Sequence, residues 1–328
     1  MDDLKKSLMD KGWNLFNQQE YLLALASFND VLKLDQNNGK AWFAKGAVIA
    51  SLADNKKSEQ NYINAEKMYL EALECYEKAL EFDPESAFWY CSKKGVIHDR
   101  MARYDLAKID FEKSLELKPD FVDSIHQLGH LMNDQFADYK SALAYFTSAI
   151  KITPNEAKYY WDRGDVYKNS GLYEEALEDY NTSIKLEPSD AAYLRRGILY
   201  NDMYQYDEAV KNYNSAIQLN PHDAIAYLNR GLCYERTYRN KEAVEDYYNA
   251  IQEGFYDPAK VYRDIALIKL NSLSQHQEAL EDLEKAIHLD PQNGESYYFR
   301  ALVHFRIKNT QKALEDLNMS LAYKYEDI

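Results

Sequence analysis

Proline, glycine and cysteine are all scarce in this sequence, and each shortage excludes certain structural features. With 7 prolines and 11 glycines in 328 residues, no long flexible linker is predicted. The three cysteines, Cys75, Cys91 and Cys233, are odd in number and have no metal-ligand or CxxC spacing. Such usage is typical of a reducing compartment, so we expect small buried thiols and no disulfide framework.

Long apolar runs and basic clusters are also missing. No apolar run reaches the roughly 18 residues of a membrane span, and the polar N-terminus lacks the apolar core of a signal peptide. The formal net charge is −15, and no run of Lys or Arg exceeds two residues. Because nucleic acids and anionic membranes need a basic surface, neither is expected as a partner. We predict a cytoplasmic protein.

What the chain does have is tyrosine, 29 of them, and internal repetition. The segments at 159–167, 192–200 and 226–234 read YYWDRGDVY, AYLRRGILY and AYLNRGLCY. Three kinds of landmark recur at spacings of 33 or 34 residues, namely a glycine, an alanine and a proline: Gly164, Gly197 and Gly231; Ala176, Ala209 and Ala243; Pro154, Pro188 and Pro221. A fixed period of this length predicts a solenoid of stacked units.

This pattern resembles the tetratricopeptide repeat family, whose unit of about 34 residues has small residues, aromatics and a proline at fixed positions. The resemblance covers essentially the whole chain. It implies an all-α, right-handed superhelical solenoid of about nine units, each made of a helix A and a helix B. The expected units form one solenoid over residues 1–328: 5–38, 39–87 with an insertion near 52–66, 88–121, 122–156, 157–189, 190–223, 224–258, 259–293 and 294–328.

Physical reasons support the residue types at these positions. Small residues stand where the two helices cross closely, and aromatic rings fill the spaces beside them. Proline ends helix B because it cannot donate a backbone hydrogen bond and its ring clashes with the preceding turn. Buried tyrosines supply apolar area while their hydroxyls reach a polar partner. The Tyr-rich stripes therefore predict repeat core and not a ligand cage.

The resemblance also implies a binding surface, because helix A of each unit lines the concave face. Its positions 2, 5, 9 and 12 form one stripe along the helix. Units six to nine place several apolar side chains there, with polar residues around them, and exposed apolar surface usually marks a binding site. We hypothesise a groove for a peptide or helical segment, formed by Leu194, Ile198, Asn201, Leu228, Asn229, Leu232, Lys260, Arg263, Leu267, Leu302 and Phe305. Alternatively, neighbouring units shield these side chains, or the helical register is off by one.

Some family members bind the C-terminal carboxylate of chaperones through a clamp of five polar residues. Here Asn229 and Lys260 match the clamp, Arg263 is one position off, and Leu194 and Ile198 replace the first pair. A carboxylate needs convergent charged donors. The sequence therefore does not predict a working clamp.

Signs of catalysis and of cofactors are weak. His126 and His130 are four residues apart in unit four, a spacing that can hold a metal, and Asp123 is nearby. No third ligand is evident, so we interpret both histidines as polar groove residues and predict no metal and no cofactor. No nucleotide-binding or nucleophile motif occurs, and repeats occupy the chain from end to end. We expect no enzymatic activity.

Two irregularities stand out. The insertion in unit two begins with the loop-like ADNKKSEQN, after which helix B is expected to start near Ser58 or Glu59 and to lean on a lengthened helix A or on a partner. The last helix carries Met319, Leu321, Tyr323 and Tyr325 with nothing obvious to cover them. That end is expected either to self-associate or to fray.

The sequence thus predicts a non-catalytic scaffold or adaptor that binds a protein partner in its concave groove. Two alternatives stay open. One is a regulatory subunit attached to an enzyme made by another chain. The other is an RNA-binding helical-repeat protein, against which the repeat pattern and the acidic charge argue.

Overall fold

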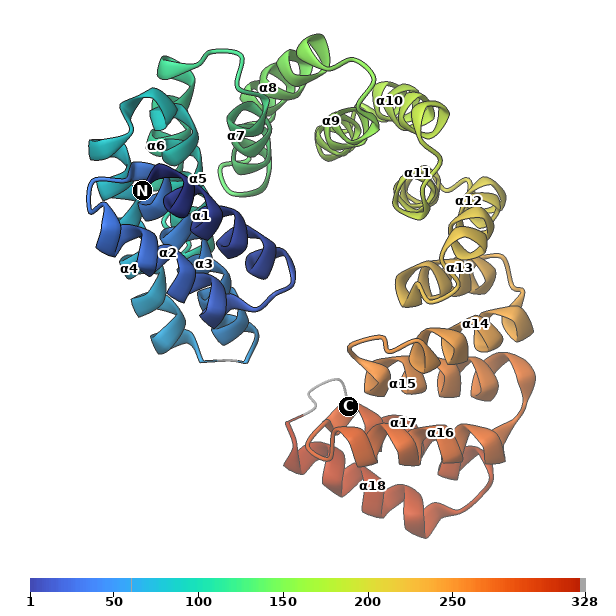
Figure 1. Ribbon diagram of the computed structural model, residues 1–328. Coiled ribbons are helices and arrows are strands. Elements are labelled where there is room, and N and C mark those ends of the chain that lie inside the picture. Colours follow the sequence, from blue (N-terminus) through green and yellow to red (C-terminus); the bar gives the residue numbers. More distant parts are fainter. Residues whose placement is uncertain (60, 325–328) are drawn as a thin grey trace. The chain divides into compact units, whose positions relative to one another are not determined.

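A computed structural model describes residues 1–59 and 61–324, and every regular element in these ranges is helical. The contacts divide the chain inside unit five into an N-terminal part, Met1–Ser170, and a C-terminal part that begins at Gly171. The N-terminal part contains nine α-helices (Figure 1): α1 (Asp2–Asn17), α2 (Tyr21–Leu34), α3 (Gly39–Ser58), α4 (Tyr62–Phe82), α5 (Ala87–Arg100), α6 (Tyr104–Leu117), α7 (Val122–Asp134), α8 (Tyr139–Ile152) and α9 (Ala157–Asn169).

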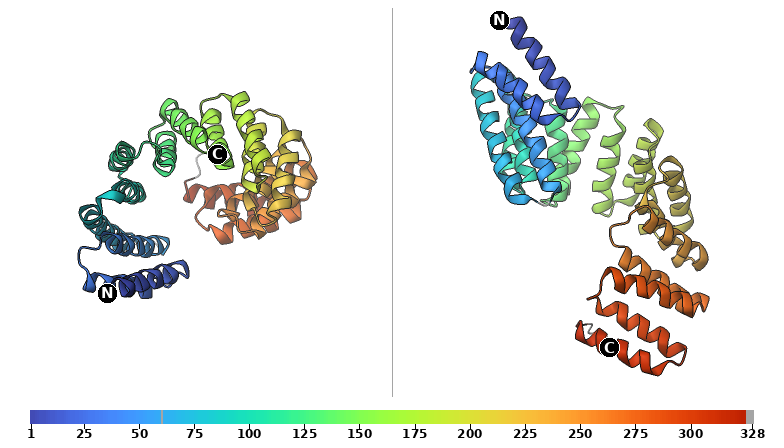
Figure 2. Two further views of the ribbon diagram at one scale, coloured as in Figure 1. Left: turned by 45° about the horizontal axis from the view of Figure 1, so that its top comes forward. Right: turned by 60° about the horizontal axis from the view of Figure 1, so that its bottom comes forward.

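The described residues of the C-terminal part form nine more α-helices: α10 (Tyr173–Leu186), α11 (Asp190–Asp202), α12 (Tyr206–Leu219), α13 (Ala224–Arg236), α14 (Asn240–Gln252), α15 (Pro258–Ile268), α16 (His276–Leu289), α17 (Gly294–Arg306) and α18 (Thr310–Ala322). Two short elements complete the set, a 3-10 turn at Pro84–Ser86 and a π-helical turn at Lys269–Leu273. Within each part, consecutive helices pack as hairpins, and each hairpin stacks on the next (Figure 2).

The eighteen helices of the described residues match the nine predicted units, with one helix A and one helix B in each. The all-α repeat solenoid is therefore confirmed. The expected buried thiols are present as well, since all three cysteines are free and buried. None of the described helices combines the length and the apolar character that crossing a bilayer requires.

Glycine in helix A and an aromatic ring in helix B set the distance between the two helices of a unit. A Cβ added to Gly197 would lie 2.6 Å from the ring of Tyr213, and one added to Gly231 would lie 2.8 Å from the ring of Tyr247. Four other units repeat the arrangement: Gly12 with Phe28, Gly46 with Tyr76, Gly95 with Phe111, and Gly129 with Phe146. Tyrosine is therefore core in these repeats, as predicted.

Tyr213 and Tyr247 occupy the same place in successive units but differ in their hydroxyls. The Tyr247 hydroxyl donates to Glu235 Oε2 at 2.7 Å. The Tyr213 hydroxyl is buried and has no hydrogen-bond partner among the described residues. A buried polar group without a partner is destabilising, whereas a satisfied one contributes modestly to stability.

We therefore expect opposite results from the same substitution at these two sites. Tyr213→Phe should raise the free energy of unfolding by about 1 kcal/mol, because it removes an unsatisfied hydroxyl. Tyr247→Phe should lower it by about 1–2 kcal/mol, because it breaks a hydrogen bond to a charged group. Urea unfolding followed by circular dichroism measures both. Equal destabilisation by the two variants would contradict the prediction.

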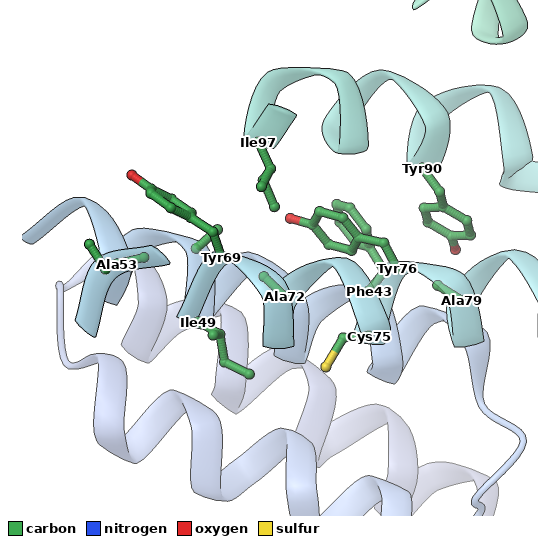
Figure 3. Close-up of a cluster of buried hydrophobic side chains, with 12 residues drawn as sticks. Phe43, Ile49, Ala53, Tyr69, Ala72, Cys75, Tyr76, Ala79, Tyr90 and Ile97 are labelled. Atoms are coloured by element: carbon green, nitrogen blue, oxygen red, sulfur yellow. The ribbon is translucent and has the colours of Figure 1, made fainter. Parts of the chain in front are cut away.

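The insertion in unit two lengthens both helices, and the prediction of a loop at its start was wrong. α3 continues to Ser58, and α4 begins at Tyr62, three or four residues after the predicted start at Ser58 or Glu59. The reason is packing, since Ala53 and Tyr69 of the two extensions are buried in one cluster (Figure 3). The Tyr69 hydroxyl also donates to Asp54 Oδ1 at 2.5 Å.

The lengthened pair also contacts unit three. Lys57 Nζ donates to the carbonyl of Arg100 at 2.7 Å, and the Arg100 guanidinium pairs with Asp54 at 2.7 Å. Tyr90 and Ile97 of α5 point toward α4 (Figure 3). The insertion thus packs on its own chain, which favours the lengthened helix A over a partner.

The last described helix, α18, keeps several apolar side chains exposed. Leu314, Met319 and Leu321 are exposed, while the ring of Tyr323 stacks on Tyr297 with centroids 5.6 Å apart. Tyr325, which we expected to be uncovered with them, lies outside the described residues. Self-association through this helix stays a prediction. Light scattering over a range of concentrations tests it, and a strict monomer would rule it out.

Candidate functional site

The predicted groove residues lie on α11, α13, α15 and α17, the A helices of units six to nine. α11 contacts α13, α15 contacts α17, and Leu228 and Leu232 of α13 pack on the cluster that contains Val261 and Ile265 of α15. The A helices of the C-terminal part therefore form one layer. Side chains at equivalent positions of successive units are brought near one another on it, as a common binding surface requires.

The apolar members of this surface are less exposed than the sequence suggested. Leu194 and Ile198 pack on a cluster that contains Tyr213, and Leu228 and Leu232 pack on the next cluster, around Tyr247. Leu267 and Leu302 are also half-buried, and Leu302 packs on the cluster of units eight and nine. Of the apolar residues in the predicted groove, Phe305 is the exposed one, at 69%. Neighbouring units thus shield much of the stripe, as the alternative interpretation holds.

The polar members are largely engaged within the chain. Arg263 is buried, and its Nε lies 3.0 Å from Glu295 Oε2 of the next unit. The Asn229 amide donates to the carbonyl of Ile225 at 2.9 Å. Asn201 Oδ1 lies 3.6 Å from the Cys233 sulfur, whereas Lys260 is exposed. Because Arg263 already has a carboxylate partner, the surface lacks the convergent free cations that would bind an anionic chain end.

One titratable residue on this surface was missed from the sequence. Asp264 follows Arg263 and stands where the clamp of some family members has its last cation. Burial raises the pKa of Asp264 to about 6; Lys260 and Arg263 oppose the rise, and the charges of Glu235 and Glu295 add to it. This surface therefore carries an exposed apolar ring, Phe305, and elsewhere a group of carboxylates that favours a cation.

A second set of polar contacts, also missed, joins helix A to helix B within a unit. Arg230 binds Asp246 through Nε and Nη2, both at 2.7 Å. Arg300 binds Asp316 in the same way, at 2.8 and 2.6 Å, and both aspartates are buried. The signal in the sequence was the arginine directly before the small residue of helix A, as in AYLNRG. These pairs join the two helices of a unit and support the fold.

The histidines of unit four gain a third partner from unit five. His126 Nε2 lies 2.7 Å from Asp162 Oδ2 and 3.1 Å from His130 Nε2, and His130 Nε2 lies 3.6 Å from the same Asp162 oxygen. The sequence analysis considered Asp123 and found no third ligand, because Asp162 is a full repeat further along the chain. These three side chains form a group able to hold a metal ion.

The electrostatics of this group are those of interacting opposite charges. Burial disfavours the charged form of His130, but its interactions with Asp162, Asp134 and Asp165 outweigh this and raise its pKa. Burial likewise acts against the charged form of Asp162, and its interactions with His126 and His130 outweigh it, so the pKa of Asp162 is lowered. The carboxylate is therefore ionised at neutral pH.

Family models match four segments of the chain. Models described as tetratricopeptide repeat match residues 157–190, 272–325 and 90–121, and one described as TPR repeat matches residues 197–237. These segments fall on units three, five, six to seven and eight to nine of the predicted register.

Individual proteins show the same similarity. A TPR repeat-containing protein of Methanocaldococcus jannaschii is 21% identical over 216 residues, which cover 57% of this chain and 38% of that protein. The Hsp70-Hsp90 organizing protein of Triticum aestivum is 27% identical over 161 residues, 48% of this chain and 24% of its own length. The matches thus span well under half of these curated relatives. The crystal structure of a tetratricopeptide repeat protein from Parabacteroides merdae has a TM-score of 0.54 and 19% identity. It covers 84% of this chain and 98% of its own chain, and it shows the same fold.

Proposed function

Because this chain belongs to the tetratricopeptide repeat family, we propose that it is a non-catalytic scaffold that binds a protein segment on the A-helix layer of units six to nine. The family and its relatives, among them a protein named as organizing Hsp70 and Hsp90, support a protein-interaction scaffold. The observation that carries the finer proposal is the exposed Phe305 near the half-buried leucines of one helical layer.

The charges on this layer indicate what kind of segment it takes. Arg263 is already paired with Glu295, and the pKa of Asp264 is raised first by burial and further by the charges of Glu235 and Glu295. A cationic side chain placed there would stabilise the charged form of this buried carboxyl group, whereas an anionic chain end would destabilise it. We therefore expect a segment with apolar anchors and a Lys or Arg.

The experiment selects peptides from a displayed random library on the immobilised full chain and measures their affinity by fluorescence anisotropy. Selected peptides should combine apolar residues with a basic residue. Because a bound cation lowers the pKa of Asp264, affinity should rise roughly tenfold from pH 5 to pH 7, as one charge-assisted contact of about 1.4 kcal/mol forms. Asp264→Asn should flatten this pH profile.

Two substitutions test the apolar part of the site. Phe305→Ala should weaken binding several-fold, because Phe305 is the exposed anchor. Leu219→Ala, on α12 in the B-helix layer, is the matched control, since Leu219 is also exposed but is not an A-helix residue. Leu228 and Leu232 do not suit this test, because both pack on the core and a charge there would disturb the fold. Equal affinity in all variants, or selection of acidic peptides, would exclude the proposed site.

Two experiments distinguish the proposed scaffold from the two alternative roles. A regulatory subunit would co-purify with an enzyme in a fixed ratio, which mass spectrometry of the native complex detects. An RNA-binding repeat protein would shift labelled RNA on a gel at physiological salt, which the net charge of −15 argues against. The cytoplasmic location and the absence of a nucleic-acid partner stay predictions that fractionation and the gel shift test.

A further inference from the structure

In the N-terminal part, three side chains from two successive units meet at one point. His126 and His130 lie one helical turn apart on α7, and Asp162 lies on α9. The three atoms that meet are two imidazole Nε2 atoms and one carboxylate oxygen, separated by 2.7, 3.1 and 3.6 Å. This convergence plays no part in the binding surface of units six to nine.

No placement of hydrogens gives all three atoms good hydrogen bonds to one another. If His126 Nε2 carries hydrogen, that hydrogen serves Asp162 at 2.7 Å, and the same nitrogen cannot also accept from His130. If His130 Nε2 carries the hydrogen instead and donates to His126, two unprotonated acceptors, His126 Nε2 and Asp162 Oδ2, face each other at 2.7 Å. If both nitrogens carry hydrogen, two N–H groups face each other across 3.1 Å. Each arrangement leaves at least one close contact without a hydrogen between suitable partners.

A divalent metal ion makes use of all three lone pairs at once. Zn²⁺ binds imidazole nitrogen and carboxylate oxygen at about 2.0–2.2 Å, so ligand atoms around a tetrahedral ion lie roughly 3.3 Å apart. The three observed separations of 2.7–3.6 Å bracket this value. We propose that His126, His130 and Asp162 bind one Zn²⁺ ion and so join unit four to unit five. Two imidazoles and one carboxylate suit Zn²⁺ better than Ca²⁺ or Mg²⁺, which prefer oxygen ligands.

The surroundings hold the ligands in place before the ion arrives. The Asp162 side chain is only 6% exposed and His126 18%, whereas His130 is 38% exposed. The His126 ring packs edge-on against Tyr159 and the His130 ring against Phe146, with centroids 5.0 and 5.2 Å apart. These contacts restrict the imidazole orientations. The open side of the site is that of His130, so a fourth position is accessible to water.

A carboxylate also stands behind one ligand. Asp134 Oδ2 lies 3.8 Å from His130 Nδ1, the nitrogen that does not face the site. Metal-ligating histidines commonly have a carboxylate at their second nitrogen, which fixes the tautomer and strengthens the ligand. At 3.8 Å Asp134 is beyond hydrogen-bond distance of His130 Nδ1, so it adds a negative charge beside this ligand without fixing its tautomer.

The test titrates the full chain, freed of metal by a chelator, with Zn²⁺ in competition with a chromophoric chelator. The wild type should bind one ion per chain. His130→Gln and Asp162→Asn should each lose at least about 100-fold in affinity, because changes outside the ligand shell alone often cost 10–100-fold. His222→Gln is the matched control: His222 Nδ1 lies 2.7 Å from Glu253 Oε2, but this pair is in no three-ligand group of the described residues. Its affinity should equal that of the wild type.

A second measurement keeps the proposal open to refutation if Asp162→Asn fails to fold. Zn²⁺ should slow amide hydrogen exchange in α7 and α9 of the wild type and leave exchange in the His130→Gln variant unchanged. Because the His130 side chain is partly exposed, the circular dichroism spectrum of the His130→Gln variant should match that of the wild type. Absence of stoichiometric binding to the wild type, or equal Zn²⁺ affinity in wild type and His130→Gln, would overturn the proposal and leave the cluster as one that binds protons only.

Discussion

Replacing Arg230 by methionine is expected to lower the free energy of unfolding by about 3–5 kcal/mol, because it leaves a buried carboxylate without its partner. The Arg230 guanidinium makes two 2.7 Å contacts with Asp246, whose side chain is 4% exposed. Methionine keeps much of the length and apolar surface of the arginine stem. The loss therefore reports the unpaired charge of Asp246 and not a missing side chain.

Amide hydrogen exchange in α13 and α14 measures this effect where it arises, since stability in a repeat protein varies along the chain. Arg239→Met is the control, because the Arg239–Glu242 pair is nearly half exposed on both sides and should contribute less than about 1 kcal/mol. Adding Asp246→Leu to Arg230→Met should restore most of the stability, since apolar replacement of a whole buried pair is often neutral. A loss as small as that of Arg239→Met would refute the prediction.

The second large effect concerns the fit of Gly231 against Tyr247. A Cβ on Gly231 would lie 2.8 Å from two atoms of the Tyr247 ring, so Gly231→Ala should cost about 1–3 kcal/mol through overpacking, although alanine favours helix. Tyr247→Leu alone should cost a similar amount by leaving a cavity. Unit eight already holds the smaller combination, with Ala266 and Leu283 buried in one cluster.

The double variant, Gly231→Ala with Tyr247→Leu, should therefore be more stable than the sum of the single effects allows. We expect an interaction free energy of about 1–3 kcal/mol in the double-mutant cycle, measured by urea unfolding. As a control, Gly231→Ala combined with Ile251→Val should be additive, because Ile251 is not among the near neighbours of a Cβ at Gly231. Additivity in the Gly231 and Tyr247 cycle would show that the matched sizes are incidental.

The repeat signature was sufficient to predict the fold, because the same residue types recur about every 34 positions and so mark where each unit lies in the sequence. The packing of Gly197 against the ring of Tyr213 follows from this signature directly. So do the eighteen helices of the described residues. The insertion in unit two was harder. The sequence of its start is polar, and the burial of Ala53 and Tyr69 in one cluster shows why the segment is nevertheless helical. Local polarity was outweighed there by packing between two lengthened helices.

The candidate sites were predicted in part, and the missing residues share one cause. Asp162 meets His126 across 36 residues, and the pKa of Asp264 is raised by burial, to which the charges of Glu235 in unit seven and Glu295 in unit nine add. Both depend on contacts between units, which a repeat pattern read one unit at a time does not contain. Burial of Leu228 by the following unit has the same origin.

The fit between glycine and ring lies inside a unit, whereas the histidine and aspartate cluster lies between two units. Deleting a whole unit would therefore leave the Gly–aromatic pairs of the remaining units intact, including that of Gly231 and Tyr247 where unit seven is kept. Deleting unit four or unit five would instead remove part of the cluster of His126, His130 and Asp162. Loss of a repeat beside the junction between α8 and α9 would thus remove a contact between units that the internal fit of each unit cannot replace.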